Sequence, residues 1–143
     1  MASNNLSIIE SFLKEFGTGS LEKAFSMFTE DAQWSIVQVV RGVTMTMDEL
    51  QPRLAGMRAA LQDNCLHLAI IDVVDGGEKL SIEVESHAKT CLDQIYNNRY
   101  CLVFEMSGGK IANVREYNDS LHVVDILAPA VAYHMSQASR PTS

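Results

Sequence analysis

Apolar side chains recur every three or four positions through the first part of the chain, which is the spacing of one buried face of an α-helix. The first stripe comprises Leu6, Ile9, Leu13 and Phe16, and a second, shorter stripe comprises Leu21, Ala24, Phe25 and Phe28. Gly17 and Gly19 stand between the stripes and end the first helix, because glycine readily adopts the conformation that closes a helix. Ser20 can cap the second helix with its hydroxyl. The pattern therefore predicts two helices in succession.

A β-rich segment and a third helix are expected next. Residues 33–40 are rich in β-branched and aromatic side chains and predict a strand, which follows a polar turn at residues 29–31. Thr46 and Glu49 have the spacing of a capping box. The helix that they cap would bury a stripe of Leu50, Leu54, Met57 and Leu61. Because Pro52 lacks a backbone N–H, we expect regular helix only from about residue 53 onward.

From Leu66 onward the apolar positions follow the period of two that characterises strands. The predicted strands are residues 66–74, 79–91, 96–106 and 110–118, and Gly-Gly turns at 76–77 and 108–109 join them into hairpins. Residues 66–74 are apolar at both parities, so we expect this strand to be covered on both faces. Asp119 or Ser120 can cap a short final helix, which Pro129 stops.

The order of these elements predicts an α+β fold, with helices early and an antiparallel meander late. A sheet of four long consecutive strands twists strongly, so we expect it to curl around the helical layer and leave a concave space. The chain of 143 residues suits a single domain over residues 1–135. Residues 136–143 are expected to form a disordered tail.

Charge and composition exclude several classes of protein. The formal net charge of −7 and the scattered basic residues argue against nucleic-acid binding, which needs clustered Lys and Arg. The sequence contains no apolar run long enough to span a membrane, and its start lacks the features of a signal peptide. Cys65, Cys91 and Cys101 form no CxxC pair and lie among apolar neighbours, so they are expected to be reduced. We therefore expect a cytoplasmic protein.

The closing hairpin carries a recognisable set of residues. They are Tyr96-Asn97-Asn98-Arg99-Tyr100, Leu102-Val103-Phe104-Glu105-Met106, Gly109-Lys110-Ile111, Arg115-Glu116-Tyr117-Asn118-Asp119 and His122. This set resembles the closing hairpin of the SnoaL-like branch of the nuclear transport factor 2-like superfamily, which includes ketosteroid isomerase and polyketide cyclases. The resemblance covers about residues 5–127. It implies a cone-shaped α+β barrel, with three N-terminal helices packed on a strongly curved, mostly antiparallel sheet.

The resemblance also implies a conical pocket lined by the concave sheet face and by the first and third helices. It implies chemistry by side chains alone, without a metal ion or an organic cofactor, and a homodimer formed through the sheet. Phe16, Trp34 and Met57 are the expected wall residues of this pocket. Packing at the dimer interface is the alternative role of Trp34, and filling of the core is the alternative role of Met57.

Glu116 is the first candidate for catalysis. Proteins similar to this chain carry an acidic residue at the matching place of an Arg-acid-aromatic motif. Inside an apolar cone a carboxyl group loses hydration, so its pKa rises and it can transfer protons near neutral pH. The alternative is a salt bridge across the sheet to Arg115, Arg99 or Lys89. Asn118 shares the face of Glu116 and could bind a substrate oxygen, or could be a rim residue instead.

Glu85 and His87 form the second candidate catalytic pair, because an acid and an imidazole on one strand face can relay a proton. The alternative is that they lie with Glu83 on a solvated outer face, since the opposite parity is apolar. A metal site built from these three residues is disfavoured because it would lack a further ligand. Epoxide hydrolysis is also disfavoured, because the chain lacks the Arg-x-Asp that similar epoxide hydrolases carry on this strand.

Tyr100 and Asn98 share a parity with Phe104 and could point into the pocket, where a tyrosine hydroxyl can stabilise a developing oxyanion. Core packing is the alternative role. Together these residues predict a cofactor-free enzyme that moves protons on a small hydrophobic, oxygenated molecule such as a polyketide, terpenoid or steroid-like compound. The expected reaction is an isomerisation, a cyclisation or a dehydration. The rival hypothesis is a non-catalytic ligand-binding or dimerisation module whose cavity is filled by its own Met and Phe side chains.

Overall fold

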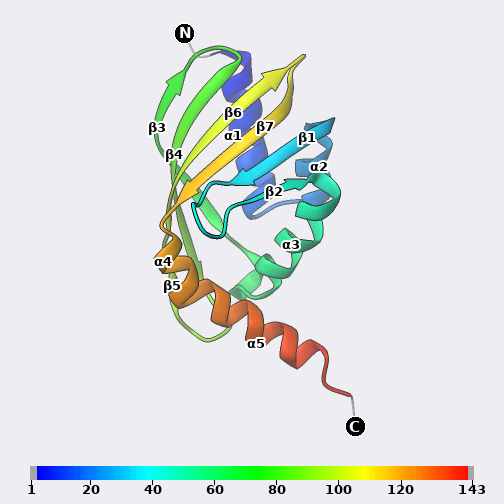
Figure 1. Cartoon of the computed structure of the whole chain (residues 1–143), viewed down its shortest axis with the longest axis vertical. Coiled ribbons are helices and arrows are strands. Elements are labelled where there is room, and N and C mark those ends of the chain that lie inside the picture. The colour runs from blue at the N-terminus through cyan, green and yellow to red at the C-terminus, as the bar shows by residue number, and fades with distance from the viewer. Residues whose placement is uncertain (1–2, 142–143) are drawn as a thin grey trace.

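The computed structural model describes residues 3–141, in which helices pack against one curled sheet (Figure 1). The early helices are α1 (Asn4–Gly17), α2 (Leu21–Ser26) and α3 (Met47–Ala59). The strands are β1 (Phe28–Ile36), β2 (Val43–Thr46), β3 (His67–Asp75), β4 (Lys79–Lys89), β5 (Ile95–Tyr96), β6 (Arg99–Ser107) and β7 (Lys110–Asn118). The sheet therefore curls around α1 and α3 as the predicted cone-shaped α+β barrel does.

The sheet order is β2-β1-β7-β6-β4-β3, and β5 pairs with the end of β4. Every neighbouring pair is antiparallel except β1 and β7, which run parallel. The parallel pair brings the start of the sheet beside its last strand, so that residues from both ends of the chain share the concave face. A short 3-10 turn, η1 (Gln62–Asn64), links α3 to β3.

Helices α2 and α3 begin where the predicted caps place them. The Ser20 hydroxyl accepts a hydrogen bond from the backbone N–H of Lys23, and Thr46 and Glu49 form a complete capping box. The expectation that α3 becomes regular only from about residue 53 is wrong, because Pro52 lies inside the helix. Pro52 and the residue four positions earlier, Asp48, are both exposed, so water can bind the carbonyl group that the proline leaves without a donor.

The first strand is shifted from its predicted position. β1 covers Phe28–Ile36, so residues 29–31 belong to the strand, and a register shift follows Phe28. Val39 and Val40 are fully exposed in the loop to β2, a strand that was not predicted. Pairing explains the difference, because Ile36 is the last β1 residue that has strand partners on both sides. Val37 still donates a backbone hydrogen bond to Glu116 of β7, but Val39 and Val40 beyond it are in no strand.

The third strand is less covered than its apolar sequence predicts. β3 is the last strand in the sheet order, and Ile71 and Val74 are 48% and 68% exposed. Only Leu68 and Val73 of this strand pack against the core. The prediction that both faces of this strand are covered is wrong for a single copy of the chain. The position of β3 at the edge of the sheet, and not its apolar content, decides how exposed its side chains are.

The end of the chain is helical for longer than predicted. Asp119 caps α4 (Ser120–His122), which continues through the wider π-helical turn η2 (Val123–Leu127) into α5 (Ala128–Ala138). Pro129 does not stop the helix, because it lies in the first turn of α5, where a proline N–H is not needed. Helix α5 thus includes the first part of the predicted disordered tail, 136–143, and residues 142 and 143 lie outside the described residues.

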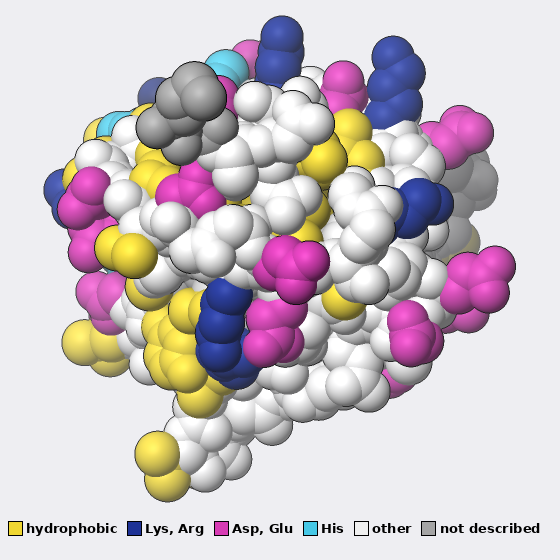
Figure 2. All heavy atoms as spheres, turned by 90° about the horizontal axis from the view of Figure 1, so that it is seen from above, with side chains coloured by type: hydrophobic (Ala, Val, Ile, Leu, Met, Phe, Trp, Pro, Cys, Tyr) yellow, Lys and Arg dark blue, Asp and Glu magenta, His cyan; other side chains and the backbone are white. Residues whose placement is uncertain are grey.

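The core lies between the helices and the concave face of the sheet. Aromatic rings of Phe12, Phe16, Phe28 and Trp34 pack on one another there, and the Phe16 and Trp34 rings stack at 5.2 Å. On the face seen in Figure 2, Lys and Arg side chains stand apart from one another among acidic ones. In the described part of the chain, no helix is both long enough and apolar enough to cross a membrane.

Candidate functional site

A cavity of about 160 Å³ opens between the helices and the concave sheet face. Most of the wall of this cavity is apolar. The wall includes residues of α1, α3, β1, β2, β4, β5, β6, β7 and η2. An engineered cavity of about 150 Å³ binds benzene, so a ligand about the size of one ring fits without rearrangement of the wall. The side chains with polar groups in this wall are Trp34, Arg53, Tyr96, Tyr100, Glu116 and Asn118.

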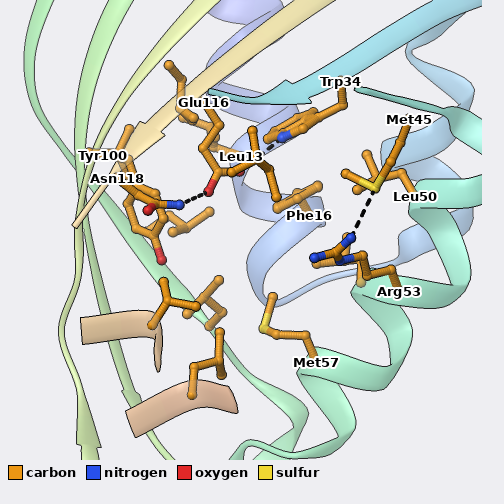
Figure 3. A pocket seen from close by; sticks show the side chains of 18 of the residues that line it. Leu13, Phe16, Trp34, Met45, Leu50, Arg53, Met57, Tyr100, Glu116 and Asn118 are labelled. Atoms are coloured by element: carbon orange, nitrogen blue, oxygen red, sulfur yellow. Dashed lines mark hydrogen bonds between the residues drawn. The ribbon is translucent and has the colours of Figure 1, made fainter. Parts of the chain in front are cut away.

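Glu116 lies in the cavity wall and is held by two hydrogen bonds (Figure 3). The indole N–H of Trp34 donates to Oε1 at 2.9 Å, and the amide of Asn118 donates to Oε2 at 2.6 Å. The parallel pairing of β1 with β7 creates the first contact, because Trp34 pairs with Val114 and Ile36 pairs with Glu116. Each carboxyl oxygen therefore has one donor, and neither donor carries a charge.

The predicted alternative for Glu116, a salt bridge across the sheet, is wrong. Each of the three cations proposed for it has a different acidic partner: Arg115 lies 3.7 Å from Glu105, Arg99 lies 3.0 Å from Glu85 and Lys89 lies 3.1 Å from Asp93. These pairs lie on the surface of the sheet or in a loop. Glu116 is thereby left without an ion-pair partner among the described residues.

Burial raises the pKa of the Glu116 carboxyl group above its ordinary value, because the charged form loses hydration. The hydrogen bonds from Asn118 and Trp34 oppose this shift, and the positive charge of Arg53 opposes it to a lesser degree. The net effect is that the protonated form of Glu116 is more favoured in the folded protein than it would be in water. A carboxyl group of this kind can both accept and return a proton closer to neutral pH.

Asn118 lies beside Glu116 in the cavity wall, as the period of two predicts. Its Oδ1 atom is buried and has no hydrogen-bond partner among the described residues. The amide nitrogen makes the bond to Glu116, which means that the side chain is oriented by that one contact. Asn118 thus holds the carboxyl group of Glu116 in this structure.

Two tyrosine hydroxyls form a second polar group in the wall. The hydroxyls of Tyr96 and Tyr100 lie 2.9 Å apart, and Tyr100 donates to Ser86 at 3.4 Å. Burial raises the pKa of Tyr96 and raises that of Tyr100 well above its usual range. Both phenols therefore stay protonated at neutral pH and can donate hydrogen bonds.

Tyr96 was not predicted as a site residue. It shares its parity with Asn98 and Tyr100 in the recognised motif, so the parity argument that selected those two residues could have found it.

Asn98 was predicted to touch the substrate, but the structure places it behind the wall. It is 1% exposed and does not line the cavity. Its amide nitrogen donates to the Tyr96 hydroxyl at 3.0 Å and to the Asp119 carbonyl at 3.2 Å. Its Oδ1 accepts hydrogen bonds from the backbone N–H groups of Arg99 and Asp119. Asn98 therefore supports Tyr96 and closes the corner between β7 and α4.

The three predicted wall residues all line the cavity. Phe16 of α1 stacks on Trp34 with an angle of 5° between the ring planes, and this contact helps hold the indole N–H toward Glu116. Met57 of α3 faces these rings from the other side of the cavity (Figure 3). Helices α1 and α3 and the sheet thus all supply side chains to the wall.

Glu85 and His87 are far from this arrangement, since they lie on the outer face of β4. The inward positions of that strand are Leu80, Ile82 and Val84, which are fully buried. Glu85 forms its ion pair with Arg99 and lies 3.8 Å from His87 on the same outer face. The pair therefore does not face the cavity, and the structure shows the stated alternative, an outer face, because burial of the apolar parity places the polar parity outside.

Arg53 is a cavity residue that the sequence argument missed. It lies three positions after Leu50 and four before Met57, on the face of α3 that borders the cavity. Its Nη1 atom lies 3.7 Å from the sulfur of Met45 (Figure 3). The helical spacing was sufficient to place Arg53 beside the cavity, but the predicted stripe of this helix included apolar residues only. Among the described residues, no cluster of His, Cys, Asp and Glu side chains could hold a metal ion.

Comparison with known proteins identifies the fold. No protein-family model and no curated protein sequence matches the chain. Among solved structures, PrhC from Penicillium brasilianum NBRC 6234 matches with a TM-score of 0.79 and 15% identity, over 96% of this chain and 92% of that one.

Two other solved structures give similar matches. A protein described as a SnoaL-like polyketide cyclase from Jannaschia sp. CCS1 matches with a TM-score of 0.71 and 12% identity, over 87% of this chain and 92% of that one. TerC, crystallised with polyporic acid, matches with a TM-score of 0.74 and 15% identity, over 88% of this chain and 99% of that one. At these identities the matches show a shared fold, and a fold by itself does not determine a reaction.

Proposed function

Given that the chain has the cone-shaped SnoaL-like fold of the nuclear transport factor 2-like superfamily, we propose that it is a cofactor-free enzyme of proton transfer. Its substrate would be a small hydrophobic molecule that bears oxygen, such as a polyketide, terpenoid or steroid-like compound, of which the open cavity would hold a part about the size of one ring. The reaction would be an isomerisation, a cyclisation or a dehydration. The observation that carries the proposal is the carboxyl group of Glu116, which lies in the wall of an open apolar cavity with a raised pKa.

Glu116 would act as the acid or base. In its ionised form it would remove a proton from a carbon next to a carbonyl group, and the electrons of the broken C–H bond would form the enolate. Tyr100 or Tyr96 would donate its hydroxyl proton in a hydrogen bond to the enolate oxygen, in place of the hydrogen bond that it now donates within the Tyr96–Tyr100–Ser86 chain. Return of the proton from Glu116 to a different carbon completes an isomerisation. In a dehydration, the enolate electrons form a C=C bond to the neighbouring carbon, the C–O bond of that carbon breaks, and its hydroxyl group takes the proton from Glu116 and leaves as water.

The hydrogen bonds around Glu116 suit both steps. Trp34 and Asn118 orient the two carboxyl oxygens without neutralising them, so the carboxyl group keeps its capacity to accept a proton. Phe16, Met57 and the other apolar residues of the wall exclude water, which strengthens the electrostatic interactions in the cavity. The presence of polyporic acid in the TerC structure and the description of the Jannaschia protein support the substrate class.

The rival hypothesis, a non-catalytic module, predicts a cavity filled by its own Met and Phe side chains. Phe16, Met45 and Met57 line the cavity here and leave it open, which favours a bound ligand. The homodimer through the sheet stays a prediction from resemblance. Removal of one proton-accepting group should abolish catalysis but leave ligand binding largely unchanged. One substitution can therefore distinguish an enzyme from a ligand-binding module.

The test begins with a thermal-shift screen of hydrophobic ketones, lactones and epoxides, because a ligand that binds only the folded state raises its melting temperature. Turnover of each hit is then measured for the wild type and for Glu116→Gln, which keeps the shape of the side chain but cannot accept the proton. We expect turnover to be lost and affinity to stay within about tenfold, a change of about 1.4 kcal/mol or less.

Glu85→Gln is the matched control, because it makes the same change on the outer face of the sheet. It is expected to keep full turnover. Retention of turnover by Glu116→Gln would remove Glu116 from the mechanism. Hits that bind the wild type without any reaction would support the non-catalytic module instead.

A further inference from the structure

Arg53 brings a positive charge to a cavity that is otherwise apolar apart from neutral donors and Glu116. It lies on α3, across the cavity from β7, which carries Glu116 (Figure 3). Its charge reaches Glu116, since it is one of the influences on that carboxyl group. A ligand in the cavity would therefore lie between one cation and one acid.

The structure gives Arg53 no acidic partner among the described residues. The acid best placed to pair with it is Glu49, four positions earlier on the same helix, where helical ion pairs form most readily. Glu49 instead accepts hydrogen bonds from the hydroxyl and the backbone N–H of Thr46 in the capping box. The capping box thus keeps the expected partner away from the guanidinium group.

Arg53 is exposed to solvent at the edge of the cavity, and Figure 3 shows its guanidinium group pointing inward beside Met45. Its Nη1 atom lies against the sulfur of Met45, which is 3% exposed, and a thioether is only a weak acceptor. Most of the five N–H donors of the arginine are therefore free for a ligand. A planar fork of donors matches the two oxygens of a carboxylate or of the enolate of a 1,3-dicarbonyl compound.

We infer that the cavity binds an acidic ligand, whose planar anionic oxygen group is held by Arg53 while its apolar body lies against Phe16 and Met57 with the reactive carbon beside Glu116. The inference rests on the proposed function for the role of Glu116, and it adds the substrate class, an apolar carboxylic acid or an acidic 1,3-dicarbonyl compound. Arg53 is then the residue that selects acids over neutral compounds of the same shape.

The experiment measures the affinities of matched pairs of probes by titration calorimetry with the full chain. Benzoate and benzamide have nearly the same size and differ in charge, and both suit a cavity of about 160 Å³. The enolate of 1,3-cyclohexanedione and neutral cyclohexanone form the second pair, which distinguishes an enolate ligand from a carboxylate ligand. We expect at least one anion to bind about tenfold more tightly than its neutral partner at low ionic strength, with a smaller ratio at high salt.

Arg53→Gln should reduce that preference to within about twofold, because the shorter amide can still donate a hydrogen bond but carries no charge. Arg53→Lys should keep part of it. Arg99→Gln is the matched control, since it removes the same charge from the outer face of the sheet, and it should keep the whole preference. Circular dichroism and melting temperature check that each variant is folded, which the exposed position of Arg53 favours.

Equal affinity for anion and neutral partner in both pairs would overturn the inference, as would a preference that survives Arg53→Gln, or the absence of binding by either anion. The same titrations with Glu116→Gln separate this inference from the proposed function. A preference for anions that persists in Glu116→Gln, with no reaction in the wild type, would sustain the role of Arg53 and refute the enzyme. Turnover of neutral ketones without any preference for anions would support the proposed enzyme and refute the role of Arg53.

Discussion

At the scale of single residues, Glu116 is held by two donors that carry no charge, Trp34 and Asn118. A cationic partner in direct contact would lower the pKa of the carboxyl group and keep it ionised. Neutral donors orient the group but offset only part of the loss of hydration, so its pKa is raised. This arrangement lets Glu116 exchange protons closer to neutral pH. It also means that the charged form of Glu116 lowers the stability of the folded state.

The raised pKa predicts how the stability depends on pH. Between the ordinary glutamate pKa and the raised value, the folded state binds more protons at Glu116 than the unfolded state does, so the free energy of unfolding falls as pH rises through this window. A tenfold difference in proton affinity between the two states corresponds to about 1.4 kcal/mol. Replacement of Glu116 by Gln removes this contribution. We therefore expect the stability of Glu116→Gln relative to the wild type to increase from pH 4 toward neutral pH, about where glutamate titrates.

Urea unfolding at a series of pH values measures this difference. Glu85→Gln serves as the control, because Glu85 is an outer-face residue with a salt bridge to Arg99. A stability difference between Glu116→Gln and the wild type that stays constant with pH would show that Glu116 titrates at its ordinary value.

At the scale of elements, α3 supplies one wall of the cavity, and its start is set by a single capping box. Thr46 and Glu49 bind each other's backbone N–H groups ahead of Pro52, which would otherwise weaken the first turns. Leu50, Arg53 and Met57 then follow on the face that borders the cavity. A local hydrogen-bond pattern thus determines where three residues of the site lie.

Replacement of Thr46 by Ala tests the contribution of this cap. The substitution removes the acceptor for the Glu49 N–H, and we expect the free energy of unfolding to fall by about 1 kcal/mol. Ser7→Ala is the matched control, because Ser7 is an exposed residue in the interior of α1, where alanine favours the helix. Equal stability of the two variants in urea unfolding would contradict the assigned role of the cap.

At the scale of the whole molecule, the end of α1 is joined to the sheet by a close backbone contact. The N–H of Leu66 donates to the carbonyl of Gly17 at 2.8 Å, and a Cβ atom on Gly17 would overlap the Leu66 carbonyl oxygen. Arg58 reinforces this junction, because its buried guanidinium donates to the carbonyls of Phe16 and Gly19. The junction keeps Phe16 beside Trp34, and so it maintains the cavity.

Two glycine substitutions should therefore have opposite effects. Gly17→Ala is expected to lower the free energy of unfolding by about 2 kcal/mol or more, because backbone has to move. Gly56→Ala is expected to raise it by about 0.5–1 kcal/mol, because Gly56 lies inside α3 with open space at the Cβ position. Thermal unfolding of the two variants measures both effects, and destabilisation of similar size in both would contradict this account of the junction.

Much of the fold could be predicted from local patterns. The stripe from Leu6 to Phe16, the capping box at Thr46 and the two Gly-Gly turns are interactions between residues near in sequence, and each lies where it was predicted. The errors concern interactions between distant residues. The exposure of β3 depends on its position at the edge of the sheet, and the early end of β1 depends on where β2 and β7 pair with it.

The candidate site divides in the same way. Period-2 alternation was sufficient to place Glu116 and Asn118 on one face. The same alternation on β4 left both parities open for Glu85 and His87, and the structure shows the outer-face alternative. Tyr96 and Arg53 had usable signals of parity and helical spacing. The hydrogen bond between Trp34 and Glu116 had none, because it joins residues 82 positions apart.

The amino-acid sequence by itself determined the helices, the hairpins and the sharing of a face by Glu116 and Asn118, because these follow from the repeat of one helix or strand. Only the tertiary structure decided that this face is concave, that Trp34 reaches Glu116 from the first strand, and that Arg53 stands across the cavity from them. The physical reason is that the curl of a sheet and the side on which helices cover it are set by packing between distant segments. No repeat within a single segment contains that information.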